Sequence, residues 1–198
     1  MEIKNQKDYF NDQYKNWLNT VDENKIKIMD KSIKQLNINK NHKVLDVACG
    51  TGVLYPLLMN IPVKKYTGLD ISEKMLEEFS KEYNDAETKL GDFDKQIKLE
   101  EMYDIIIIFN SIPHFENLDV VFENSRNNLK QDGKLSIVHG RTRRGLTEHH
   151  NKIGYNLGRD AIPKDDVLEK LCNDYGFEIE EIMDEEFFFF SCRKLISD

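Results

Sequence analysis

Short apolar runs alternate along this chain with stretches whose apolar residues recur at helical spacing. The clearest run is Tyr103–Phe109, because its consecutive isoleucines form the continuous β-branched segment that a parallel strand buried on both faces requires. The other apolar runs are shorter and are bounded by glycine, asparagine or acidic residues. Strands are therefore predicted over residues 44–47, 66–70, 87–93, 103–109, 134–139, 177–183 and 187–194.

The segments between these strands are amphipathic. Ser72 is a residue type that favours a helix N-cap, and after it Met75, Leu76, Phe79 and Tyr83 recur three or four positions apart. Residues 140–160 show no clean period. Helices are expected over residues 1–40, with a break at 37–42, and over 53–59, 72–83, 119–129 and 163–175.

Five strand–helix alternations predict an α/β fold, a doubly wound and mostly parallel sheet with helices on both faces. The last two strands depart from this alternation because only a short turn at residues 184–186 separates them, so they form a closing hairpin. A chain of 198 residues is long enough for one sizeable core but short for two domains. We therefore predict a single domain over residues 1–198.

Two glycines come shortly after the first predicted strand, in the stretch VLDVACGTG of residues 44–52. Glycine lets the backbone approach a ligand closely, and the helix that follows offers free N–H groups. In a doubly wound sheet, ligands bind beyond the carboxyl ends of the strands, where Asp70, Asp92 and residues 110–114 are also expected. Asp70 is predicted to accept hydrogen bonds from both hydroxyls of a ribose; alternatively, it only caps the next helix.

The glycine loop lacks the third glycine of a dinucleotide-binding fingerprint. Three positions after Gly52 the chain has Tyr55, a bulky residue where close helix–strand packing is expected. The chain is also too short for a separate catalytic domain. The expected ligand is therefore an adenosine derivative without a pyrophosphate.

Five motifs in a fixed order resemble those of the class I S-adenosylmethionine-dependent methyltransferases. They are VLDVACGTG at 44–52, GLDIS at 68–72, GDF at 91–93, a strand ending in NSIPH at 110–114, and LKQDGKLSI at 129–137. The resemblance covers about residues 40–140. It implies a Rossmann-like, seven-stranded sheet with an antiparallel last strand, and S-adenosylmethionine as the cofactor.

By the same resemblance, residues 46–52 would hold the methionine part of the cofactor, Asp70 its ribose, and Asp92 with Phe93 its adenine. Ala48 departs from the family, since many members have glycine there. Alanine fits if its φ is negative, which we expect because the strand is still ending at this position. The expected cofactor-binding residues are Asp46, Ala48, Cys49, Gly50, Gly52, Asp70, Ile71, Met75, Asp92, Phe93, Asn110 and Ser111.

Methyl transfer from a sulfonium needs alignment, exclusion of water and, for a protonated acceptor, a base. Residues 139–154 look like those of a subgroup of small bacterial members of the family, and that resemblance implies roles for His139, Arg143 and His150. We predict His114, His139 and His150 as catalytic candidates, although each could instead only position the substrate. The same three histidines are also a possible metal site, but no ligand pair has a tight motif spacing.

Two segments are predicted to lie on the substrate side. The basic stretch around Arg143 is either a solvated loop or a site for an anionic substrate group, which an arginine fork would bind. Phe10, Tyr14 and Trp17 belong to an N-terminal helical segment that either docks on the sheet or closes over the site as a lid. The chain then divides into a helical cap (1–40), a cofactor-binding core (43–140), a substrate-side segment (140–160) and a last helix with its hairpin (163–198).

Composition narrows the function further. The formal net charge of −8 argues against general nucleic-acid binding, which needs a basic face. No apolar run approaches the roughly 20 residues of a membrane span, and the polar start lacks the apolar region of a signal peptide, so a cytoplasmic protein is expected. Three widely spaced cysteines indicate neither a disulfide framework nor a zinc site.

The sequence therefore predicts an S-adenosylmethionine-dependent methyltransferase that acts on a small-molecule acceptor. One alternative is a protein or nucleic-acid methyltransferase, but residues 110–113 lack the adjacent prolines expected for an enzyme that methylates DNA amino groups. Another alternative is a non-catalytic, S-adenosylmethionine-binding regulatory module, because intact cofactor residues indicate only binding.

Overall fold

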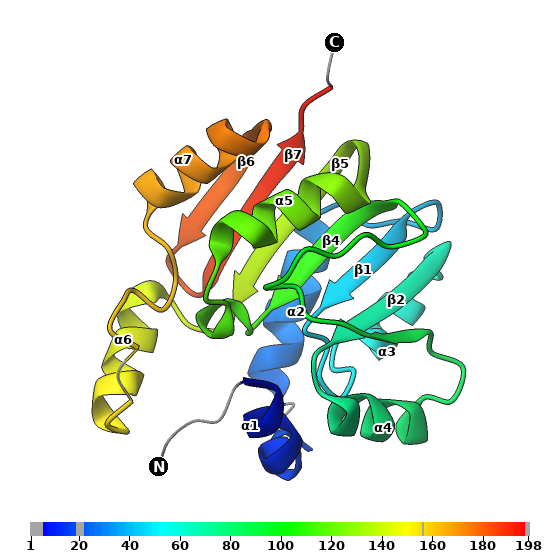
Figure 1. The fold of residues 1–198 in the computed structure, drawn as a ribbon, viewed down its shortest axis with the longest axis horizontal. Helices are drawn as coiled ribbons and strands as arrows, with labels where there is room; N and C mark the ends of the chain where they lie inside the picture. The colour runs from blue at the N-terminus through cyan, green and yellow to red at the C-terminus, as the bar shows by residue number, and fades with distance from the viewer. Residues whose placement is uncertain (1–5, 19–21, 156, 197–198) are drawn as a thin grey trace.

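The computed structural model describes residues 6–18, 22–155 and 157–196, and these form a seven-stranded sheet with helices on both faces (Figure 1). The strand order is β3-β2-β1-β4-β5-β7-β6, and β7 runs in the direction opposite to the other six strands of this sheet. The predicted fold class is confirmed. The strands are β1 Lys43–Val47, β2 Lys65–Asp70, β3 Thr88–Leu90, β4 Tyr103–Phe109, β5 Leu129–His139, β6 Phe177–Asp184 and β7 Phe188–Lys194.

Helices α5 and α7 cover one face of the sheet, and α2 and α3 cover the other, while α1 and α6 lie beyond the carboxyl ends of the parallel strands (Figure 1). None of the helices in the described segments is long and apolar enough to cross a membrane. The helices are α1 Gln6–Gln13, η1 Tyr14–Trp17, α2 Glu23–Gln35, α3 Tyr55–Met59, α4 Glu73–Glu82, η2 Ile112–His114, α5 Leu118–Asn128, α6 Arg143–Lys152 and α7 Asp165–Tyr175.

Helix α6 lies in the segment for which the sequence showed no period. Its N-cap is Thr142, whose hydroxyl oxygen accepts a hydrogen bond from the N–H of Gly145 at 3.0 Å. Leu146 is its one buried side chain, so the helix carries almost no apolar stripe. A helix with so little burial leaves no hydrophobic period in the sequence to detect.

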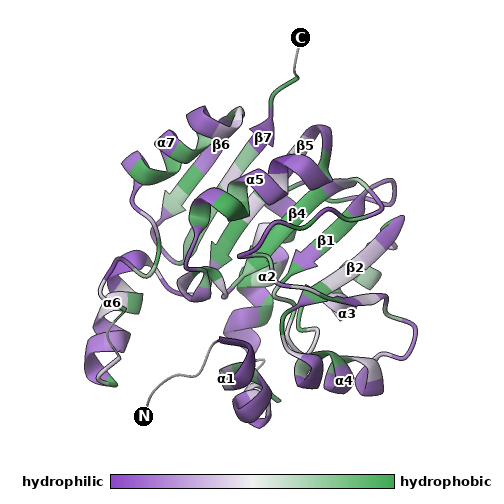
Figure 2. Ribbon diagram, in the orientation of Figure 1, coloured by the Kyte–Doolittle hydropathy of each residue, from purple (hydrophilic) through white to green (hydrophobic). Residues whose placement is uncertain are grey.

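Strand β4 divides the core between the two faces of the sheet. Ile106 and Ile108 join the cluster under α5 and α7, whereas Ile105 and Ile107 join the cluster that contains residues of α2, α3 and α4. Successive side chains of a strand point to opposite faces, so a strand buried on both sides must be apolar throughout. Figure 2 shows the central strands as hydrophobic and much of the outer surface of the helices as hydrophilic.

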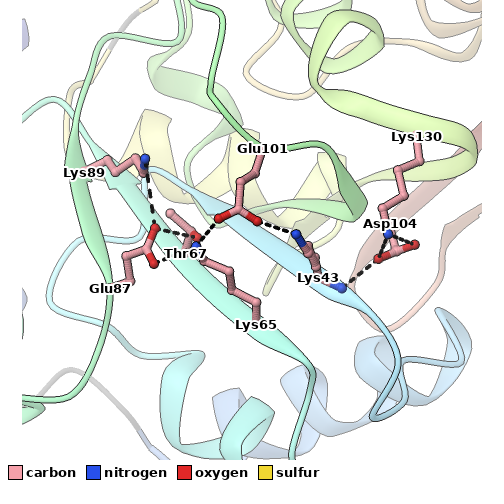
Figure 3. A network of polar contacts seen from close by, with 8 residues as sticks. All are labelled: Lys43, Lys65, Thr67, Glu87, Lys89, Glu101, Asp104 and Lys130. Atoms are coloured by element: carbon pink, nitrogen blue, oxygen red, sulfur yellow. Dashed lines mark hydrogen bonds and ion pairs between the residues drawn. The ribbon is translucent and has the colours of Figure 1, made fainter.

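A network of ion pairs and hydrogen bonds joins the residues at the starts of β1 and β2, at the amino edge of the sheet (Figure 3). Glu101 accepts hydrogen bonds from the ammonium groups of Lys43 on β1 and Lys65 on β2. Nearby, Asp104 accepts from the backbone N–H of Lys43 at 2.7 Å and from Lys130 Nζ at 2.7 Å. The two lysines hold the pKa of the Glu101 carboxyl down at about 2 by hydrogen bonding to its charged form.

Glu101→Gln is expected to lower the melting temperature at neutral pH, because two lysines lose their shared carboxylate. The folded-state pKa of Glu101 lies below its ordinary value of 4.5, so its contribution is complete above pH 4.5 and is lost as the pH falls toward 2. The difference between wild type and variant should therefore shrink across that window in thermal unfolding. The neighbouring Glu100→Gln is the matched control, and an equal effect there would contradict the role given to Glu101.

Candidate active site

A cavity opens at the carboxyl edge of the sheet, between the ends of β1, β2 and β4 and the helices α1 and η1. Most of the residues that the sequence assigned to a cofactor line it. Met29 and Lys25 of α2 also line it. The sequence did not single them out, because Met29 has the spacing of a core residue and Lys25 that of an ordinary helix-surface lysine. The predicted residues in the lining are Phe10, Trp17, Ala48, Cys49, Gly50, Asp70, Ile71, Met75, Asp92, Phe93, Asn110, Ser111 and His114.

The glycine loop is held by its own backbone. Cys49 N–H donates to the carbonyl of Leu69 at 3.1 Å, and Gly52 N–H donates to the carbonyl of Cys49 at 3.0 Å. Gly52 has a φ of +86°, and a Cβ added there would lie 2.5 Å from the ring of Phe79. Only glycine satisfies both the backbone and the packing at this position. Gly52 is not in the cavity lining, so it shapes the loop from outside the cavity.

Ala48 contradicts the prediction of a negative φ. Strand β1 ends at Val47, so Ala48 already belongs to the turn, and its φ is +56°. An L-residue with a side chain is strained in this region. Asn110, after β4, has the same φ of +56°, and its side-chain oxygen accepts the N–H of Gly140 at 2.7 Å. Both strained residues line the cavity at strand ends, where strain is often stored at functional sites.

Asp70 joins the glycine loop to the start of α4. One carboxylate oxygen accepts the N–H of Gly50 at 2.8 Å, and the other accepts the N–H of Ser72 at 2.8 Å. Burial raises the pKa of Asp70, while these backbone hydrogen bonds act to lower it. The N-cap of α4 is Ser72, whose hydroxyl accepts from Met75 N–H, so the alternative that Asp70 only caps this helix is wrong.

Asp46 lies beneath the loop and not in the cavity. It is 2% exposed, is absent from the lining, and accepts the hydroxyl of Tyr66 at 2.8 Å. Its carboxylate therefore supports the loop from below through Tyr66, and the predicted role of Asp46 in holding the cofactor stays a prediction. Burial raises the pKa of Asp46 to about 7, partly offset by the Tyr66 hydrogen bond.

The N-terminal helices α1 and η1 form part of the cavity wall through Gln6, Phe10 and Trp17. Asn11 of α1 accepts hydrogen bonds from the Ser72 hydroxyl at 2.7 Å and from Lys74 N–H at 3.2 Å, at the first turn of α4. The ring centroid of Phe10 lies 5.0 Å from that of His114, in an edge-on contact. Helix α1 thus docks on the start of α4, whereas α2 packs on the sheet.

Tyr14 is the predicted substrate residue of this segment that the cavity leaves out. It is absent from the lining, and Lys15 Nζ lies 5.9 Å from the centroid of its ring. Of these two aromatic residues of η1, Trp17 lines the cavity and Tyr14 does not.

The three candidate histidines gather on the side of α6. His114 lines the cavity, His139 ends β5 with its Nδ1 accepting Arg141 N–H at 3.0 Å, and the His150 ring lies 5.0 Å from the ring of Tyr155. Burial lowers the pKa of His114 and of His139 to about 4 in each case, and it also lowers the pKa of His150. All three are therefore neutral near pH 7.

The histidines do not form a metal site. Within residues 6–18, 22–155 and 157–196, no group of three or more histidine, cysteine, aspartate or glutamate side chains is arranged to hold a metal ion. The hypothesis of a metal on His114, His139 and His150 is therefore wrong for this arrangement. Each imidazole has neighbouring rings or backbone in place of further ligands.

The guanidinium of Arg143 is engaged in contacts within the fold. It donates to Asp165 at 2.7 Å and to the Pro163 carbonyl at 2.8 Å, and it lies 3.6 Å from Asp184. The guanidinium carbon lies 4.5 Å from the centroid of the Phe188 ring. These contacts attach α6 to the last helix and hairpin and pair Arg143 with two acids of this chain, so its predicted role at an anionic substrate stays a prediction.

Ala48→Gly is expected to stabilise the fold. Relief of about 1–2 kcal/mol of left-handed strain outweighs the roughly 0.5–1 kcal/mol that glycine costs in chain entropy. The unfolding free energy from urea titration should therefore rise by about 0.5 kcal/mol. Ala86→Gly, at a residue without positive φ, is the control and should lose stability. If Ala48→Gly lowers the unfolding free energy as much as Ala86→Gly does, the claim that Ala48 is strained is contradicted.

Asp46→Asn is expected to stabilise the fold at pH 8 by on the order of 1–3 kcal/mol, because the amide accepts the Tyr66 hydroxyl without a buried charge. The folded-state pKa of about 7 lies above the ordinary 3.8, so the contribution of Asp46 is complete below 3.8 and is lost as the pH rises through 7. Urea unfolding at pH 5 and pH 8 should show the gain growing with pH. Asp12→Asn, at an exposed position, is the control and should show no such trend. An Asp46→Asn variant that is less stable than wild type at pH 8 would refute the buried charge.

Comparison with known proteins places this geometry in a family. A family profile described as "Methyltransferase domain" matches residues 38–182. Malonyl-[acyl-carrier protein] O-methyltransferase of Acetivibrio thermocellus is 27% identical over 135 residues, 66% of this chain and 47% of that protein. Demethylmenaquinone methyltransferase of Thermotoga maritima is 34% identical over 110 residues, 54% of this chain and 48% of that protein. The chain thus spans about half the length of these relatives.

Solved structures share the fold along nearly the whole chain. Magnesium protoporphyrin IX methyltransferase from Synechocystis PCC 6803, with bound SAH, has a TM-score of 0.70 at 21% identity and covers 95% of this chain and 97% of its own. A SAM-dependent methyltransferase from Aquifex aeolicus has a TM-score of 0.68 at 15% identity, with coverages of 92% and 96%. With the family profile spanning more than half of the sequence, the chain belongs to the methyltransferase domain family, within the class I S-adenosylmethionine-dependent methyltransferases that its motif order predicted.

Proposed function

We propose that this protein moves the methyl group of S-adenosylmethionine to a small-molecule acceptor. The observation that carries the proposal is the meeting of the glycine loop and Asp70 at one cavity, with Gly50 N–H bonded to the Asp70 carboxylate. The names of the relatives support a small acceptor, since they include methyltransferases for demethylmenaquinone and (S)-coclaurine. The net charge of −8 favours a small molecule over a nucleic acid.

The residues at the cavity fit such a cofactor. A Cβ added at Gly50 would have no atom within 4 Å, so the loop backbone there faces open space. Asp70 and Asp92 have carboxylate oxygens with spare lone pairs at the lining, suited to ribose and adenine donors, and buried Phe93 offers a ring. When bound, S-adenosylmethionine supplies a methyl group on a positively charged sulfur, which a nucleophile displaces in line. Residues Ala48–Gly50, Asp70 and Asp92 would orient it there.

Two features of the chain would serve the acceptor side. Phe10 and Trp17 pack against His114 with ring centroids 5.0 and 6.4 Å away, so they shield the cavity mouth from water. His139 uses Nδ1 to accept Arg141 N–H, which leaves the proton on Nε2 and makes this imidazole a donor. His114 lines the cavity and is neutral, so it is the histidine that would accept a proton from the acceptor.

The proposal is tested by incubating the protein with methyl-labelled S-adenosylmethionine and a metabolite extract, then identifying labelled products by mass spectrometry. A labelled small molecule that depends on active protein is the expected result. Cofactor binding without any labelled product would contradict an enzymatic role and favour a regulatory module. Label found only in protein or nucleic acid would contradict the small acceptor.

His114→Asn is expected to lower kcat by about 10²-fold or more, the range of lost general-base catalysis. Because burial holds the pKa of His114 at about 4, the wild-type rate should stay level from pH 8 to pH 5 and fall only as the ring protonates below that. The pH–rate profile of the labelling reaction measures both effects. His42→Asn, before β1, is the control. A pH–rate profile that already falls near pH 6.5, or an unchanged kcat in the His114→Asn variant, would refute the role of His114 as the general base.

A further inference from the structure

Two arginines beside the histidines carry charges that no carboxylate in the described structure neutralises. Arg141 lies two residues after the end of β5 and is exposed, and its guanidinium has no hydrogen bond or ion pair with the described residues. Arg159 donates to the carbonyls of Pro113 at 2.9 Å and of Phe115 at 2.5 Å. Carbonyl oxygens orient a guanidinium but leave its positive charge in place.

The other arginines of this region and of the hairpin are paired with acids. Arg143 pairs with Asp165, Arg144 with Glu148 at 2.8 Å, and Arg193 with Asp132 at 2.9 Å. The chain has 36 acidic residues against 28 lysines and arginines, so acidic partners are plentiful. Two arginines without a paired acid are therefore a local feature of this acidic chain, and positive charge that is not compensated favours binding of an anion.

The histidines extend this positive region to the cavity. Arg141 interacts electrostatically with both His139 and His150, and Arg159 does so with His114. Among the described residues, the charged neighbours that lower the pKa of these three rings are arginines and other histidines. The carbonyls that hold Arg159 flank His114, which lines the cavity, so the charge of Arg159 is fixed beside the cavity wall.

We infer that Arg141 and Arg159 bind an anionic group of the methyl acceptor, a carboxylate or a phosphate, next to His114. This inference rests on the proposed function and adds the chemical class of the substrate. Arg141 would then supply the guanidinium fork predicted for the basic stretch around Arg143. The neutral histidines then act as hydrogen-bond partners of the anion, and its charge in turn favours their protonation.

The anion site is tested without turnover by NMR titration of the full chain, with and without S-adenosylhomocysteine. The probes are sodium benzoate and sodium phosphate, with sodium chloride at equal ionic strength as the reference, and the readout is the histidine Cε1–H signals. Saturable shifts of the His139 and His150 signals are expected with at least one probe, and the stronger probe identifies carboxylate or phosphate. Shifts that chloride reproduces in full would overturn the inference.

Arginine variants test whether the shifts of the histidine signals depend on Arg141 and Arg159. Arg141→Gln should weaken probe binding about tenfold, and Arg141→Lys should recover part of it, because one charge-assisted hydrogen bond contributes about that much. Arg144→Gln, an exposed arginine of α6 paired with Glu148, is the matched control and should leave binding unchanged within about twofold. Arg159→Gln should weaken binding as well. An equal loss in the Arg144 variant, or none in the Arg141 variant, would contradict the assignment.

A second arm separates this inference from the proposed function. The metabolite extract is divided by ion exchange into anionic, neutral and cationic pools before labelling. Labelled product from the anionic pool, with KM raised about tenfold by Arg141→Gln and kcat nearly unchanged, supports the inference. Product from only the neutral or cationic pool refutes the anion site and leaves methyl transfer standing. Product from no pool refutes methyl transfer, and the NMR titration still decides the anion site.

Discussion

The arrangement of the site depends on the two backbone hydrogen bonds that the Asp70 carboxylate accepts. They join the glycine loop after β1 to the first turn of α4 after β2, two segments that the sheet alone would only bring near each other. The same turn of α4 receives Asn11 of the N-terminal helix, so the cap over the cavity is fixed by the same corner of the fold. One buried acid thus organises the floor of the site and the attachment of its cover.

The two edges of the sheet use charge in opposite ways. At the amino edge, lysines and carboxylates are paired into a network that holds the strand starts together (Figure 3). At the carboxyl edge, burial keeps the histidines neutral, and Arg141 has no acid paired with it in the described structure. Paired charges stabilise and leave nothing for a ligand, whereas uncompensated ones keep their attraction for one. The placement of charge therefore indicates where binding takes place.

The sequence predicted features that depend on local pattern. The isoleucine run of β4, the order of strands and helices, and the positions of Asp70 and Gly50 at one edge all follow from periodicity and from the rules of parallel sheets. Features that depend on tertiary contacts could not be predicted from the sequence. Arg143 resembles a substrate arginine until Asp165 and Asp184 are brought beside it, and the φ of Ala48 depends on where β1 stops pairing.

The central claim is that the glycine loop and Asp70 form the cofactor site, and calorimetric titration with S-adenosylhomocysteine tests it most directly. Wild type should bind one equivalent, and Asp70→Asn should bind at least about tenfold more weakly, since a carboxylate hydrogen bond to a ribose hydroxyl is charge-assisted. The melting temperature of the variant is measured in parallel, to separate lost affinity from lost folding. No binding by the wild type, or equal affinity in a folded Asp70→Asn variant, would contradict the account.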